Sequence, residues 1–179
     1  MTTTLDPQAQ QRFDILSTVF APRSVAIVGA SDTATKIGGI PVDYHKQFGF
    51  AGPIYPVNPK GGQIQGLAAY PSLRAIGAPI DVAIFAVPAE RVVAALGDAI
   101  AAGVHGVVLF TSGYAEISPE DASAQARLGA MARDAGVRLL GPNCLGFMNV
   151  RSGAYATFSP AAKSGRVAPG HIGLVTQSG

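Results

Sequence analysis

Short apolar runs alternate with helical patterns along most of this chain, and this alternation constrains its fold more than any other feature. The runs occupy residues 24–30, 52–56, 81–87, 106–110, 137–140 and 172–176. A short, continuous apolar run predicts a strand that is buried on both faces. We therefore expect six strands, each a few residues long.

Helical patterns separate several of these strands, because apolar residues recur there at every third or fourth position. The expected helices cover about 8–19, about 37–48, the segment after Pro88 up to Gly103, and the segment from Ser118 to Gly136. Their apolar positions at helical spacing include Val92, Val93, Leu96, Ile100, Leu128 and Met131. Strand–helix alternation predicts an α/β fold with a doubly wound parallel sheet.

Composition excludes several classes of protein. The chain of 179 residues is 48% hydrophobic and 13% charged, unlike a disordered protein, and its one cysteine cannot form an internal disulfide. Its 13 Lys and Arg residues are scattered with no two adjacent, unlike the clustered basic face of a nucleic-acid-binding protein. The first residues lack a signal-peptide pattern, and no apolar run is long enough to span a membrane. These features predict a soluble, cytoplasmic protein.

The loop after the first expected strand, Gly29–Gly39, has features of a phosphate site. Ligands of open parallel sheets bind outside the carboxyl ends of the strands, and a Gly turn entering a helix offers free backbone N–H groups. Ser31 adds a hydroxyl and Lys36 a positive charge. The loop is not G-x-G-x-x-G, since Ser31 replaces the second Gly, and not a P-loop, since no Gly precedes Lys36. A plain turn with a solvated Lys36 is the alternative.

The second strand end, Val57-Asn58-Pro59-Lys60, lacks the acidic residue that an NAD site uses to hold the ribose hydroxyls. Lys60 would instead attract a phosphate on the ribose. This favours NADP or coenzyme A over NAD. The alternative is a simple Asn-Pro turn with Lys60 on the surface.

Three further loops follow predicted strands at the same edge of the sheet, and we call the edge formed by all five loops the rim. Pro88, in Val87-Pro88-Ala89, lacks a backbone donor and leaves an apolar shelf that suits an adenine, although the same residues are typical of a helix start. Residues 111–116 form a hydroxyl-rich loop, and residues 141–146 carry Asn143 among two glycines and a proline. Together the five loops predict one binding crevice.

An ordered series of motifs resembles a known family. The motifs are GAS-x4-K-x-G (Gly29 to Gly38), IYPVNPK (Ile54 to Lys60), VPA (Val87 to Ala89), SGYAE (Ser112 to Glu116) and GPNCLG (Gly141 to Gly146). This series is similar to the CoA-binding domain of NDP-forming acyl-CoA synthetases, the acetate–CoA ligase family, which are relatives of the succinyl-CoA synthetase α subunit. The resemblance covers about residues 15–179, and the ending GHIGLVTQSG resembles the start of the family's second, flavodoxin-like domain.

The resemblance implies that coenzyme A lies along the predicted rim. The implied contacts at the nucleotide half of the ligand are Gly29 as a cofactor-binding residue, Ser31, Lys36 and Gly38 at the CoA phosphates, Pro59 and Lys60 at the nucleotide end with Lys60 near a phosphate, and Val87, Pro88 and Ala89 beside the adenine. The implied contacts at the other half are Ser112, Gly113 and Glu116 on the path to the pantetheine and thiol, and Asn143 near the thiol.

The implied domain organisation has four parts. They are an N-terminal helix (1–20), a Rossmann-like CoA-binding domain (21–150), a linker or irregular arm (151–170), and the first strand of a truncated flavodoxin-like ligase domain (171–179).

We predict no catalytic and no metal-binding residue in this chain. In the family, a phosphoryl group passes through a histidine of the second domain and an ATP-grasp domain. None of the three histidines (His45, His105 and His171) matches that position, so we interpret them as structural or surface residues. Cys144 has no general base placed near it by a motif and is interpreted as a small buried residue. No Cys/His spacing indicates zinc.

The expected function is CoA binding within an acid–CoA ligase, whose ATP or GTP chemistry lies in missing domains or a partner subunit. On this view, the fragment alone is inactive. One alternative is a CoA- or acyl-CoA-sensing module of an acetyltransferase, which the sequence after Gly179 would distinguish. Another is an NADP-dependent oxidoreductase, which predicts NADP binding without competition by CoA.

Overall fold

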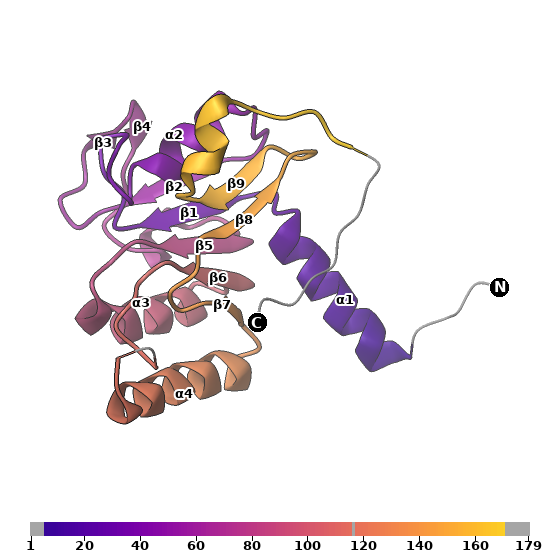
Figure 1. Ribbon diagram of the computed structural model, residues 1–179, viewed down its shortest axis with the longest axis vertical. Coiled ribbons are helices and arrows are strands. Elements are labelled where there is room, and N and C mark those ends of the chain that lie inside the picture. Colours follow the sequence, from indigo (N-terminus) through magenta and orange to yellow (C-terminus); the bar gives the residue numbers. More distant parts are fainter. Residues whose placement is uncertain (1–5, 116, 171–179) are drawn as a thin grey trace.

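A five-stranded parallel sheet forms the centre of the molecule. The computed structural model describes residues 6–115 and 117–170. The sheet strands are β1 (Val25–Val28), β2 (Ile54–Val57), β5 (Val82–Phe85), β6 (Gly106–Leu109) and β7 (Arg138–Leu140). They lie in the order β2-β1-β5-β6-β7, and every pair is parallel (Figure 1). The predicted α/β class and parallel sheet are confirmed.

Both faces of the sheet are covered, as continuous apolar strands require. Alternate strand residues point to opposite faces, so Ala83 and Phe85 of β5 join one apolar cluster while Val82 and Ile84 join the other. All four residues of β5 are fully buried. The sheet is therefore doubly wound.

Four α-helices of the described residues flank the sheet. They are α1 (Pro7–Phe20), α2 (Ile40–Gln47), α3 (Ala89–Ala101) and α4 (Pro119–Asp134). Residues of α3 and α4 pack into one apolar cluster, and residues of α1 and α2 into the other. Figure 1 shows α1 extending away from the sheet, with only its C-terminal end close to the strands.

Two details of the helices differ from the sequence predictions. The second helix starts at Ile40 rather than Ile37, because Gly38 and Gly39 belong to the preceding turn. Val93, which shares the helical spacing of the core positions of α3, leaves 59% of its surface exposed.

A short hairpin follows β2 and was not predicted. It consists of β3 (Gln63–Ile64) and β4 (Leu67–Ala68), which are antiparallel. Tyr70 then forms a parallel bridge to Val57 on the outer side of β2, and the 3-10 helix η1 (Arg74–Ile76) leads into β5. The hairpin lies at the carboxyl end of β2, next to the loop that follows β1.

The segment expected to be a linker or irregular arm, residues 151–170, contains regular structure instead. It holds β9 (Ala154–Thr157), which pairs antiparallel with β8 (Gly146–Asn149), and the 3-10 helix η2 (Pro160–Ser164). All four residues of β9 are buried, and Tyr155 packs against the ring of Tyr44 from α2 and against the ring of Phe48, which directly follows α2. Tertiary packing thus orders a segment whose own pattern is weak. The predicted strand at 172–176 lies outside the described residues.

None of the helices within the described ranges is both long enough and apolar enough to cross a bilayer.

Candidate functional site

The sheet order creates a switch point beside β1. The chain passes from β1 to β2 on one side and then returns to β5 on the other, and ligands of such sheets bind where the direction reverses. A cleft of about 670 Å³ lies there. It is lined by Val28, Gly29, Val57, Asn58, Pro59, Lys60, Pro71, Ser72, Ala86, Val87, Pro88, Arg91, Ala94, Ala95 and Asp98. Five of the predicted contacts, Gly29, Pro59, Lys60, Val87 and Pro88, therefore share one cleft.

Two glycines shape the loop between β1 and α2. Gly29 has φ +84°, and a Cβ atom there would lie 2.4 Å from the carbonyl oxygen of Ala86 at the end of β5. A Cβ atom on Gly38 would lie 2.1 Å from the carbonyl oxygen of Gly29. The loop therefore folds back on its own start, closed by a hydrogen bond from Ser31 N to Gly38 O (3.3 Å). Gly29 is therefore required by its positive φ and by the close approach of the end of β5, and Gly38 by the packing of the loop on itself.

The β3–β4 hairpin holds this loop from outside the cleft. The side-chain amide of Gln65 donates to the carbonyl oxygens of Ser31 (3.1 Å) and Gly39 (2.9 Å). The Gln65 backbone N–H donates to Asp32 Oδ1 (2.6 Å). Gln65 and Gly66 both have positive φ, as a two-residue hairpin turn with the twist of its strands requires. Sequence reasoning missed Gln65, although the pair Gln65-Gly66 between the apolar residues Ile64 and Leu67 was a possible signal for the turn.

Asn58 joins the ends of β1 and β2. Its Nδ2 donates to the carbonyl oxygen of Ala30 (3.0 Å), and its Oδ1 accepts from the backbone N–H of Lys60 (3.0 Å). This Asx turn fixes the backbone at Lys60, whose side chain is exposed at the rim of the cleft. Lys36 is also exposed, but it does not line the cleft.

The ends of β6 and β7 meet in a second group of predicted residues. Thr111 Oγ1 donates to the carbonyl oxygen of Val87 (2.6 Å), and Thr111 O accepts from the backbone N–H of Asn143 (2.9 Å). Ser112 and Gly113 follow directly, and a Cβ atom on Gly113 would touch Ala89 at 3.9 Å. This group adjoins the cleft through Val87 without lining it. Glu116 lies outside the described residues.

The thiol of Cys144 is packed in the structure. Its Sγ lies within hydrogen-bonding distance of the carbonyl oxygens of Leu109 (3.4 Å) and Leu140 (3.5 Å), and burial raises its pKa. It therefore stays a thiol at neutral pH. The interpretation of Cys144 as a small buried residue is confirmed in part, because the side chain packs within the fold but is only half-buried.

The two described histidines are structural or at the surface. His45 is fully buried in α2, burial lowers its pKa to about 4, and its Nδ1 lies 2.6 Å from the carbonyl oxygen of Pro41. His105 lies at the surface, 3.4 Å from Asp81. Burial favours a raised pKa for Asp81, but hydrogen bonds and attraction from Arg23 lower it overall. His171 lies outside the described residues, and within them no three His, Cys, Asp or Glu side chains gather as metal ligands.

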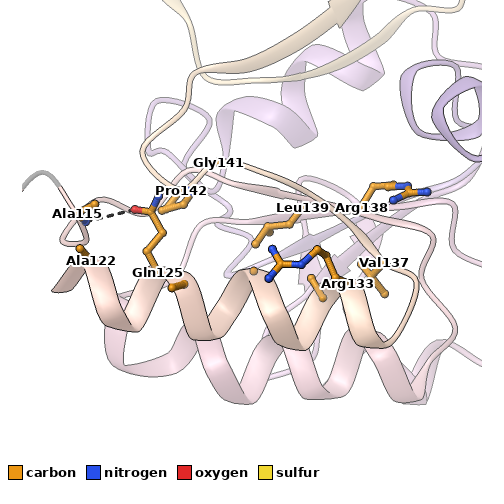
Figure 2. Close-up of a pocket in the computed structure, with 12 residues that line it drawn as sticks. Ala115, Ala122, Gln125, Arg133, Val137, Arg138, Leu139, Gly141 and Pro142 are labelled. Carbon is orange, nitrogen blue, oxygen red and sulfur yellow. Dashed lines mark hydrogen bonds between the residues drawn. The ribbon is translucent and has the colours of Figure 1, made fainter. Parts of the chain in front are cut away.

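A second cavity lies at the outer edge of the sheet. Figure 2 shows it between α4 and the segment from β7 to Pro142, with Gln125 reaching across to the backbone N–H of Ala115 (3.3 Å). Its volume is about 620 Å³. The loops predicted to form the crevice contribute Ala115, Gly141 and Pro142 to this cavity, but none of the implied CoA contacts lines it.

An open, doubly wound sheet with a cleft at its switch point defines the Rossmann-like class of ligand-binding domains. Within that class, the chain belongs to the CoA binding domain family, whose profile matches residues 23–150. The resemblance stated from the motifs is confirmed.

Similar proteins support the same assignment. The chain is 38% identical over 176 residues to acetate–CoA ligase [ADP-forming] II of Archaeoglobus fulgidus, covering 95% of this chain and 25% of that protein. It is 36% identical over 165 residues to the α subunit of the corresponding Pyrococcus furiosus ligase, covering 92% of this chain and 35% of that subunit. The chain thus spans only about a quarter to a third of these relatives.

A solved structure has the same fold. It is the dinucleotide forming acetyl-coenzyme A synthetase 1 of Ca. Korarchaeum cryptofilum in complex with phosphate and ADP, with a TM-score of 0.77 and 34% identity. The match covers 81% of this chain and 31% of that one. The chain is a CoA-binding domain that corresponds to one portion of ADP-forming acyl-CoA synthetases.

Proposed function

We propose that this domain binds coenzyme A across the carboxyl ends of its strands, with the nucleotide end in the switch-point cleft. The observation that carries the proposal is the combination, in one cleft, of an apolar floor from Val87 and Pro88 with the exposed ammonium of Lys60 at the rim. An adenine ring fits the apolar part, and a phosphate on the ribose fits the cation.

The remaining predicted contacts extend from this cleft in two directions. Ser31, Lys36 and Gly38 belong to the loop after β1, where a charged ammonium and a tightly closed turn suit the pyrophosphate. Ser112, Gly113, Glu116 and Asn143 follow β6 and β7, which suits the pantetheine arm and the thiol. The hydrogen bond from Thr111 to Val87 supports a continuous path between the adenine end and the thiol end.

We further propose that the domain serves an acid–CoA ligase. Relatives named as ADP-forming acetate–CoA ligases imply ATP as the nucleotide, acting through domains or a subunit outside this chain. The fragment alone then binds CoA without joining it to an acid. Its single free thiol, Cys144, suits a reducing cytoplasm.

Calorimetry with CoA, NADP and NAD tests the ligand. We expect CoA to bind and NADP not to compete with it. A charge-assisted hydrogen bond contributes about 1.5–3 kcal/mol, so Lys36→Ala and Lys60→Ala should each weaken CoA binding about tenfold or more. Unchanged CoA affinity in both variants, or tighter binding of NADP than of CoA, would refute the proposal. Arg133→Ala, which alters the outer cavity, is the matched control and should bind CoA as the native chain does.

A further inference from the structure

The switch-point cleft has a second cation that motif reasoning did not identify. Arg91 lies in the first turn of α3, has an exposed side chain, and lines the same cleft as Lys60. Lys60 follows β2 and Arg91 follows β5, and these two strands flank β1. The two cations therefore reach the cleft from opposite sides of the switch point.

The carboxylate in the cleft does not neutralise them. Among the described residues that line the cleft, Asp98 is the only acid. Its Oδ1 accepts from Nε of Arg74 at 2.8 Å, and its Oδ2 accepts from the backbone N–H of Leu73 at 2.7 Å. Because Arg74 already compensates Asp98, the charges of Lys60 and Arg91 leave the cleft with an excess of positive charge.

The wall that carries Arg91 leaves room for a ligand. Arg91, Ala94, Ala95 and Asp98 form the face of α3 toward the cleft, so the residues one turn beyond Arg91 are small. Val28, Val57 and Ala86 add to the apolar floor. A flat base can lie on this floor while its sugar substituents reach the rim. An arginine there offers parallel N–H donors that match two oxygens of a phosphate, which a lysine cannot do.

We propose that Arg91 is a specificity-determining residue that, together with Lys60, binds the phosphate on the ribose of coenzyme A. This inference rests on the proposed function and deepens it, because it explains how the cleft distinguishes CoA from dephospho-CoA, which lacks that phosphate. Lys36 lies in the loop after β1 and outside the cleft lining, so it serves a different part of the ligand.

The experiment compares CoA and dephospho-CoA by calorimetry in the native chain and in Arg91→Gln. The native chain should bind CoA at least tenfold more tightly than dephospho-CoA, since a charge-assisted contact is at stake. Arg91→Gln should lose about tenfold in CoA affinity and less than twofold in dephospho-CoA affinity. Arg91→Lys should recover part of the loss, because it keeps the charge without the planar donor pair.

Two further variants separate the possible outcomes. Lys36→Gln should weaken both ligands by the same factor, and Arg151→Gln, at an exposed arginine far along the chain in the β8–β9 turn, should change neither. Binding of CoA by the native chain, with Arg91→Gln weakening both ligands equally or neither, would overturn the role of Arg91 and leave the proposed function standing. Failure of the native chain to bind either ligand would overturn the proposed function itself. Melting curves of each variant confirm that the fold is intact.

Discussion

The switch-point cleft and the outer cavity beside α4 have similar volumes, about 670 and 620 Å³, yet they differ in how they are built. The cleft lies between the ends of strands from both halves of the sheet. The outer cavity lies between edge strand β7 and small residues of α4, such as Ala122 and Ala126 (Figure 2). Volume alone would not distinguish them. The position relative to the strand order does, because the residues at the ends of β1, β2 and β5 converge on the cleft at the switch point, whereas the outer cavity borders β7 at the edge of the sheet.

Replacing a glycine by alanine should have the largest difference in effect between the two regions. Gly38→Ala places a methyl group against the Gly29 carbonyl oxygen and forces the loop after β1 open. We expect the free energy of unfolding to fall by about 3 kcal/mol, as for an overpacked site. CoA affinity should fall at least tenfold as the phosphate contacts are lost. Urea unfolding and calorimetry measure the two effects.

The control for this variant is Gly129→Ala in the outer cavity. A Cβ atom there meets only Nη1 of Arg133, the end of a flexible side chain, at 3.1 Å. Alanine favours a helix over glycine by about 1 kcal/mol, so this variant should be slightly more stable and bind CoA normally. Loss of CoA affinity in Gly129→Ala would mean that CoA binds in the outer cavity and not in the switch-point cleft.

Acid should lower the free energy of unfolding through His45, which lies in α2 directly after the loop that follows β1. The unfolded chain binds a proton at this residue below its ordinary pKa of 6.5, whereas the folded chain resists protonation until about pH 4. The contribution of His45 to the free energy of unfolding is therefore fully present above pH 6.5. It is lost as the pH falls toward 4, by about 3 kcal/mol in total. Unfolding curves from pH 7 to pH 4.5 measure this loss.

His45→Phe should remove most of that pH dependence, since phenylalanine keeps an aromatic ring beside Phe50 but carries no proton. His105→Gln, at a surface position, should retain it. If the native chain and His45→Phe lost the same stability in acid, His45 would not be the cause of the acid dependence.

A smaller effect is expected from the hairpin contact with the loop. Gln65→Ala removes two hydrogen bonds, to Ser31 O and Gly39 O, each worth about 1 kcal/mol. We expect a loss of about 1–2 kcal/mol in unfolding free energy and a several-fold loss in CoA affinity. Gln63→Ala, an exposed position in the same hairpin, is the control and should change neither quantity. Equal effects of the two substitutions would mean that Gln65 does not hold the loop.

The sheet was predictable from the sequence, and parts of the surrounding structure were not. The strands β1, β5 and β6 lie within predicted apolar runs, because burial on both faces requires continuous apolar residues. β9 escaped prediction, because Ala, Tyr and Thr become a strand here only through packing against α2, more than a hundred residues earlier in the chain. Such a contact leaves no local pattern.

The residues of the candidate site also fall into those that the sequence predicts and those that only the folded structure brings together. Residues directly after strands, such as Gly29 and Lys60, were identified because the ends of parallel strands share one edge. Gln65 and Arg91 were missed, since a hairpin turn and a helix face are brought to that edge only by the folded structure. The role of Asn58 also emerges only in the folded structure, where its amide joins two strand ends instead of remaining free for a ligand.

The strand order also sets when the cleft can exist during folding. Val25 of β1 pairs with Ile54 on one side and with Val82 on the other, and the second pairing closes a much longer stretch of chain. Closing the longer loop costs more chain entropy and slows folding. The cleft takes its lining from residues after β2 and after β5, so it exists only once both strands have paired with β1. A nucleotide that binds in the cleft selectively stabilises the fully folded chain over every species in which β5 has not yet joined.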